Sequence, residues 1–157
     1  MSQRLEKLRP RLAEAGLDTL LVTQAENRRY LSGFDGSAGW LLISQKQAIL
    51  ATDFRYTEQA TAQAPAFQVV QIRGDLNKWL PDLLKELNCK RLGFEGADLS
   101  FSAHRQLAQA IKNAGLKVRL TLTQDLVESL RAAKDADELA DLQMAAAMSD
   151  SAVEHAM

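Results

Sequence analysis

Residues 31–56 read LSGFDGSAGWLLISQKQAILATDFRY, and this stretch decides the fold class of the chain. It contains two apolar runs, GWLLIS at 39–44 and AILAT at 48–52, separated by a polar Gln-Lys-Gln turn. Two β-rich runs joined by a short polar turn are typical of an antiparallel hairpin. We therefore predict a sheet that is not purely parallel.

Strand and helix patterns alternate on both sides of this hairpin. The expected helices are 5–15, ended by Gly16, then 76–87, and 101–113 after a Ser100 cap; the expected strands are 19–23, 67–73, 91–94 and 118–122. This alternation is typical of the α/β class. We expect a single three-layer domain, with a mixed β-sheet, an early antiparallel hairpin and helices on both faces.

The C-terminal part has a different pattern. Asp135 and Glu138 have the spacing of a capping box, and apolar residues then recur at helical spacing as far as Met157. No Gly, Asn or Pro ends this helix, so we expect the native chain to continue downstream. The alternative is a free C-terminal helix that docks on the sheet.

Composition excludes several classes of protein. A length of 157 residues with 46% hydrophobic and 25% charged residues is typical of one soluble globular domain. The formal net charge of -1 favours neither nucleic acid nor an anionic membrane as a partner. The N-terminus lacks the apolar stretch of a signal peptide, and the single cysteine, Cys89, suits a reducing compartment. We expect a cytoplasmic protein.

The chain offers little material for catalysis. Its two histidines, His104 and His155, lie in separate expected helices without a metal-binding partner three or four residues away. No G-x-S-x-G segment marks a nucleophilic serine. We predict no metal site, no cofactor and no catalytic residue in this chain.

Three glycines, Gly33, Gly36 and Gly39, stand just before the hairpin. A phosphate-binding loop would lead into a helix, whereas this segment leads into a strand. We interpret the glycines as a structural loop with tight turns or close backbone contacts, beside which Phe34 and Trp40 pack.

Two groups combine basic and aromatic residues. Asn27-Arg28-Arg29-Tyr30 precedes the glycine loop, and Asp53-Phe54-Arg55-Tyr56 follows the hairpin. The end of a strand is a common place for side chains that contact a ligand, and arginine beside an aromatic ring suits that role. A structural pair between arginine and Asp53 or Asp35 would explain the same residues, so the sequence leaves both interpretations open.

Three segments in order resemble a known family: RRYLSGFDGSAGWLLI at 28–43, ATDFRYTEQA at 51–60, and ESLRAAKDADELADLQMAAAMSDSAVEHAM at 128–157. They are similar to the N-terminal domain of Xaa-Pro aminopeptidases and Xaa-Pro dipeptidases, in the creatinase/prolidase metallopeptidase family. The resemblance implies an N-terminal domain at 1–131. It also implies that 132–157 begin a linker helix toward a C-terminal catalytic domain of the pita-bread type.

The resemblance further implies a parent enzyme that cleaves the bond between an N-terminal residue and proline. Two divalent ions, manganese, cobalt or zinc, would be bound entirely by the downstream domain, so this fragment alone would be inactive. The domain would serve a homodimer or higher oligomer and shape access for proline-containing peptides. The residues implied at the substrate entrance or between subunits are Arg55, Tyr56, Phe54, Arg29 and Tyr30.

One departure concerns Phe54, because the family often has Gly or Ser at this position. Three other functions stay open, two from the residues and a third from the resemblance. They are a stand-alone module that binds a small molecule through the glycine loop and Arg55, an oligomerisation module, and the N-terminal domain of a creatinase-like hydrolase.

Overall fold

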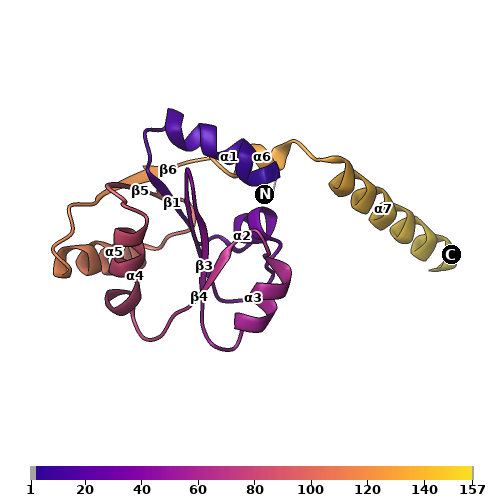
Figure 1. The fold of residues 1–157 in the computed structure, drawn as a ribbon. Coiled ribbons are helices and arrows are strands. Elements are labelled where there is room, and N and C mark those ends of the chain that lie inside the picture. The colour runs from indigo at the N-terminus through magenta and orange to yellow at the C-terminus, as the bar shows by residue number, and fades with distance from the viewer. Residues whose placement is uncertain (1–2, 157) are drawn as a thin grey trace.

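A computed structural model describes residues 3–156, which form a six-stranded sheet with helices on both faces (Figure 1). The strands are β1 (Thr19–Val22), β2 (Trp40–Ser44), β3 (Ala48–Thr52), β4 (Gln68–Gln71), β5 (Arg91–Glu95) and β6 (Arg119–Thr123). The helices are α1 (Gln3–Glu14), α2 (Ala25–Ser32), α3 (Thr57–Gln63), α4 (Leu76–Glu86), α5 (Phe101–Asn113), α6 (Glu128–Ala132) and α7 (Ala136–Ala156).

The sheet is mixed, with the strand order β4-β3-β2-β1-β5-β6. β2 runs antiparallel to both of its neighbours, and the remaining neighbouring strands are parallel. In the register, Leu42 of β2 lies opposite Leu21 of β1 and Ile49 of β3. The predicted hairpin is therefore confirmed, and it is the element that reverses one strand in an otherwise parallel sheet.

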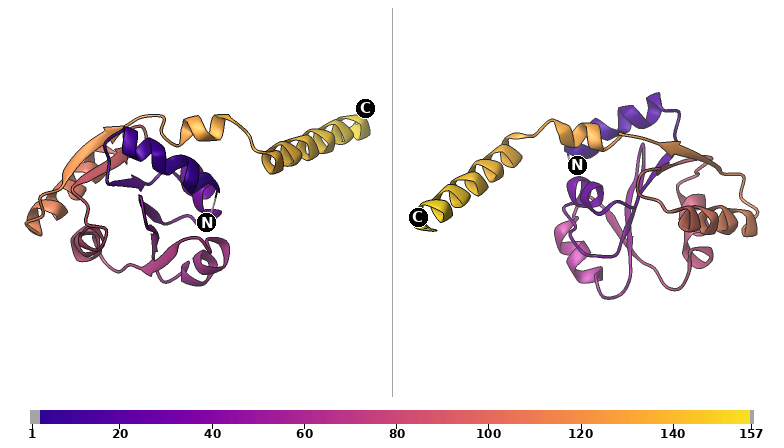
Figure 2. Two further views of the ribbon diagram at one scale, coloured as in Figure 1. Left: turned by 45° about the horizontal axis from the view of Figure 1, so that its top comes forward. Right: turned by 180° about the vertical axis from the view of Figure 1, so that it is seen from behind.

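Two hydrophobic cores lie on opposite faces of the sheet. Leu41 and Ile43 of β2 contribute to the core under α1, α2, α3 and α6, while Leu42 between them contributes to the core under α4 and α5. The views in Figure 2 show this separation of the helices. Because both faces are covered, the central strands are apolar throughout instead of alternating. The predicted three-layer α/β domain is confirmed.

The strand directions place several loops at one edge of the sheet. β1, β3, β5 and β6 all point the same way, so Thr23, Asp53 and Glu95 lie where these strands end. β2 runs the other way and begins at this edge, directly after Gly39. This carboxyl edge, the usual place for binding in α/β sheets, carries the candidate site.

Three helices were not expected from the sequence: α2, α3 and α6. In α2 the inward face includes Asn27 and Arg28, which are buried with polar partners, so the segment lacks an apolar stripe. In α3 the only buried residue is Ala60. Both helices are short, and neither gives the hydrophobic period that identifies a helix in sequence.

The capping box at the start of α7 is confirmed. Asp135 N donates to Glu138 Oε2 over 3.0 Å, and Glu138 N donates to Asp135 Oδ1 over 2.9 Å. Beyond this first turn the helix extends away from the sheet (Figure 1), and its described side chains from 139 to 155 are exposed. The alternative of a C-terminal helix docked on the sheet is therefore wrong for this structure.

Candidate functional site

The turn after β3 presents Arg55 to solvent in a fixed orientation. Arg55 Nε and Nη2 donate to the two carboxylate oxygens of Asp53, over 3.0 and 2.8 Å, and the Arg55 side chain is still 60% exposed. The backbone N of Arg55 also donates to Asp53 Oδ1. These bonds lower the pKa of Asp53, whose carboxylate accepts them in its charged form.

Of the two interpretations of this turn from the sequence, the structural pair with Asp53 is present, and the contact with a ligand stays a prediction. The Arg55–Asp53 pair exists, but it lies at the surface and leaves part of the guanidinium free to meet a ligand. Phe54 is 74% exposed beside it. An arginine held by one carboxylate beside an exposed ring can receive a carboxylate or carbonyl oxygen from outside.

Tyr56 connects the turn to the glycine loop. The Arg55 guanidinium carbon lies 5.3 Å from the centre of the Tyr56 ring, and the Tyr56 hydroxyl is 2.6 Å from Ser37 Oγ. The Tyr56 ring also packs edge to face on Phe34, with ring centres 6.0 Å apart. The two segments that the sequence placed apart, 33–39 and 53–56, thus form one unit.

The glycines of the loop serve close packing around Phe34. A Cβ at Gly36 would lie 2.2 Å from Cζ of the Phe34 ring, and one at Gly39 would lie 3.1 Å from the same ring. Gly33 ends α2 with φ at 81°, in the left-handed region. The predicted packing of Trp40 beside this loop is wrong, because Trp40 faces the opposite core and packs on Trp79.

The structure separates Arg29 and Tyr30, the two residues of the basic-aromatic group on α2 that were expected at the substrate entrance or between subunits. Arg29 is exposed on the outer face of the helix. Tyr30 is only 9% exposed, and its hydroxyl donates to the Leu130 carbonyl of α6 over 3.3 Å. Burial accordingly raises the pKa of Tyr30. Neither side chain joins the Arg55 turn through a hydrogen bond among the described residues.

Sequence reasoning missed Arg28, the buried arginine of this group. Its side chain is 4% exposed and donates from Nη2 to the Gly36 carbonyl over 2.7 Å and from Nη1 to the Gly39 carbonyl over 3.0 Å. Burial lowers its pKa. In the sequence Arg28 and Arg29 are equivalent neighbours, and only the helical phase of α2 distinguishes them.

A polar network occupies the same edge between β5 and α6. Glu95 is buried, and its Oε2 accepts from the backbone N of Thr23 and Gln24 over 2.7 and 2.8 Å, at the start of α2. Burial raises the pKa of Glu95 although these donors favour its charged form. Asn27 links Glu95 to Arg131, whose Nη1 donates to Asn27 Oδ1 over 3.0 Å.

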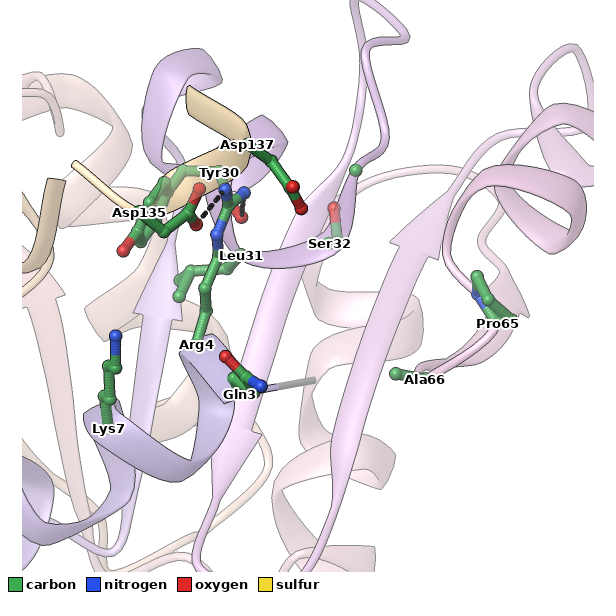
Figure 3. A pocket seen from close by; sticks show the side chains of 11 residues that line it. Gln3, Arg4, Lys7, Tyr30, Leu31, Ser32, Pro65, Ala66, Asp135 and Asp137 are labelled. Carbon is green, nitrogen blue, oxygen red and sulfur yellow. Dashed lines mark hydrogen bonds and ion pairs between the residues drawn. The ribbon is translucent and has the colours of Figure 1, made fainter. Parts of the chain in front are cut away.

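A pocket of about 590 Å³ lies between α1, the end of α2 and the start of α7. In Figure 3 the Arg4 side chain reaches between Tyr30 and Asp135. Arg4 Nη1 donates to the Tyr30 carbonyl and Nη2 to Asp135 Oδ2, each over 2.8 Å, and its guanidinium lies 4.2 Å from the centre of the Tyr30 ring. These contacts join the capping box of α7 to the domain.

Within residues 3–156, no three His, Cys, Asp or Glu side chains are grouped so that they could hold a metal ion. His104 packs on Phe94, with ring centres 5.0 Å apart, and His155 Nδ1 lies 2.9 Å from the Ser151 carbonyl. Cys89 is a buried free thiol whose pKa is raised by burial. None of the helices described is both long and apolar enough to span a membrane.

Known structures share this fold. An Xaa-Pro dipeptidase from Bacillus anthracis superposes with a TM-score of 0.90 at 38% identity, covering 98% of this chain and 42% of that chain. The N-terminal domain of the cytoplasmic peptidase PepQ from Mycobacterium tuberculosis H37Rv gives a TM-score of 0.75 at 37% identity, covering 83% of this chain and 99% of that domain.

Curated sequences agree with the structures. The peptidase YqhT of Bacillus subtilis, named as uncharacterized, is 37% identical over 152 residues, which are 97% of this chain and 42% of that protein. A probable Xaa-Pro aminopeptidase P of Paracoccidioides brasiliensis is 31% identical over 73% of this chain and 21% of that protein. The chain thus spans less than half the length of these relatives. Its residues 4–133 match the Creatinase/Prolidase N-terminal domain, and the chain belongs to that family.

Proposed function

We propose that this chain is the non-catalytic N-terminal domain of a metal-dependent Xaa-Pro peptidase, whose parent enzyme cleaves the bond between an N-terminal residue and proline. The support is the family membership, together with relatives named as Xaa-Pro dipeptidase and aminopeptidase. Those relatives extend well beyond the part that matches this chain. The remaining part of such a protein would supply the catalytic domain, to which α7 would lead.

The observation that carries a role at the substrate entrance is the exposed turn at 53–56. Arg55 is oriented by its hydrogen bonds to Asp53, and its guanidinium packs on the Tyr56 ring. It lies at the carboxyl edge of the sheet. In the full-length enzyme it would meet a carboxylate or carbonyl oxygen of a short peptide, at its own active site or that of a neighbouring subunit. Phe54 would narrow the same entrance, as a bulky exposed ring.

The two divalent ions belong, in this proposal, to the downstream domain. The described residues offer no ligand set of three suitable side chains, so no chemical step is assigned to this chain through a metal. Its contribution is to bind and orient the peptide, and to hold a homodimer or higher oligomer together. The proposed location is the cytoplasm, which the name of the PepQ relative supports.

The test uses the gene beyond Met157. An open reading frame that continues into an Asp, Asp, His, Glu, Glu series would identify the catalytic domain, and the full-length protein should hydrolyse Xaa-Pro peptides when given manganese. Failure to turn over such peptides, with metal bound, would overturn the proposed activity.

The entrance role has its own test. Arg55→Ala in the full-length enzyme should raise KM for Xaa-Pro peptides while the metal content stays unchanged. Arg105→Ala, at an exposed arginine of α5, is the matched control and should leave KM unchanged. In the 157-residue chain Arg55→Ala should shift the melting temperature by less than about 2 °C, because Arg55 is exposed. A large loss of stability would instead assign Arg55 a structural role.

A further inference from the structure

Arg28 is a buried cation whose hydrogen-bond partners are backbone carbonyls, and its guanidinium carbon also lies 5.8 Å from the centre of the Phe34 ring. Its two terminal nitrogens donate to the carbonyls of Gly36, Gly39 and Thr23, and Arg28 forms no ion pair with an acid among the described residues. Its Nε has no hydrogen-bond partner there either. Burying a charge without a paired carboxylate costs folding free energy, and such exceptions concentrate at functional sites.

The positions of these carbonyls explain what the arginine does. Gly36 and Gly39 stand on either side of the loop segment that contains Ser37, and one planar guanidinium holds both carbonyls at once. Lysine could reach one of them but lacks the rigid fork that fixes two. Arg28 therefore bridges the two ends of this loop segment from inside the domain.

The loop in turn contacts the 53–56 turn at two points and the end of β3 at a third. Ser37 Oγ meets the Tyr56 hydroxyl at 2.6 Å, Thr52 Oγ1 donates to the Ala38 carbonyl over 2.6 Å, and Phe34 packs on the Tyr56 ring. Ser37 and Ala38, which make two of these contacts, lie between Gly36 and Gly39, whose carbonyls Arg28 binds. A change in the loop would thus reach Tyr56 directly.

We propose that Arg28 is a positioning residue, which acts through the backbone of residues 36–39 and the Ser37 hydroxyl to fix Tyr56 and, through its ring, Arg55. Arg28 itself touches no substrate. The inference deepens the proposed function, on which its consequence for peptide binding rests. Its structural part concerns only the 157-residue chain, and that part can be tested without any peptidase activity.

The first experiment measures backbone 15N relaxation in the 157-residue chain. In the wild type the order parameters of Gly36, Ser37 and Tyr56 should be near 0.85, as in rigid backbone, and in Arg28→Lys they should fall below about 0.6. Arg105→Met, at an exposed arginine of α5, is the control and should leave all three unchanged. Order parameters that stay near the wild-type values in Arg28→Lys would overturn the proposal.

A second variant covers the case in which Arg28→Lys does not fold. Ser37→Ala removes only the last link, at an exposed position of the loop. It should leave Gly36 and Gly39 ordered while the Tyr56 ring gains mobility, seen as averaged ring and side-chain signals. Phe34 still packs on the ring in this variant, so a Tyr56 ring as rigid as in the wild type would overturn the link through the Ser37 hydroxyl on which the proposal depends.

The second experiment uses the full-length enzyme with Xaa-Pro peptides. Arg28→Lys should raise KM about fivefold with kcat within about twofold, since binding groups move while the catalytic domain is untouched. An unchanged KM would overturn the effect of Arg28 on binding. A wild-type enzyme inactive on these peptides would instead reject the proposed function, and the relaxation data would still decide the positioning role.

Discussion

The side-chain amide of Asn27 donates to Glu95 over 2.7 Å, which joins the first turn of α2 to the end of β5. The same amide nitrogen lies 2.7 Å from Gln24 Oε1 and from Glu128 Oε1, and the amide oxygen accepts from Arg131. One fully buried asparagine therefore ties together the sheet, α2 and α6, the helix that precedes α7.

Asn27→Ala should destabilise the domain by about 2–3 kcal/mol, because it leaves the buried Oε1 of Glu95 and the half-buried guanidinium of Arg131 without this partner. Urea unfolding monitored by circular dichroism measures the change. Asn113→Ala removes an amide at the exposed end of α5 and should cost less than about 0.5 kcal/mol. Equal effects of the two variants would show that the Asn27 network adds little stability.

The raised pKa of Glu95 predicts a pH dependence of defined sign. Between its ordinary pKa of 4.5 and its higher folded value, the folded chain binds a proton that the unfolded chain does not. The contribution of Glu95 to the free energy of unfolding is therefore complete below the ordinary pKa, and it is lost as the pH rises through the folded pKa.

The measurement compares urea unfolding of the wild type and Glu95→Gln from pH 7 down to pH 4.5. The wild type should gain stability relative to the variant as the pH falls, because glutamine does not titrate. Asp18 has a lowered pKa, so its protonation decreases stability as the pH falls. This effect is the same in the wild type and in Glu95→Gln and cancels in the comparison. Parallel curves would contradict a raised pKa at Glu95.

The hairpin and most strands could be predicted because both cores demand apolar residues there. In the runs at 39–44 and 48–52, most residues of β2 and β3 expose no more than 8% of their surface. α2 could not be predicted in this way, since its inward side chains include Asn27 and Arg28. Their burial depends on carbonyls and a carboxylate from distant segments, which a single sequence does not reveal.

The sequence predicted only those contacts of the candidate site that are local in the chain. Asp53 and Arg55 are two residues apart, so their pairing is local and the sequence could suggest it. The contact between Ser37 and Tyr56 joins residues 19 apart, and it exists only because β2 and β3 bring the loop and the turn to the same edge. Positioning by Arg28 depends in addition on the phase of an unexpected helix.

Gly36→Ala should disturb the loop through packing. The added Cβ would overlap the Phe34 ring, which is fully buried and has no room to move away, so we expect a loss of about 1–3 kcal/mol. Gly115→Ala is the control, with open space around its Cβ position and only the strain of a φ of +65°. A smaller loss at Gly36 than at Gly115, measured by urea unfolding, would contradict a loop packed on Phe34.

Hydrogen exchange should show that α7 is the least stable helix of the chain. Its side chains from 139 to 155 are exposed, and most of the stability of a helix in a protein comes from tertiary packing, which α7 lacks beyond its first turn. Amides beyond the first turn should therefore exchange at least about tenfold faster than those of α5, which buries Leu107, Ala110 and Ile111. Protection of α7 equal to that of α5 would contradict this prediction. A dilution series would then show whether a second copy of the chain holds the helix. Amide protection that comes from such a dimer decreases as the protein is diluted.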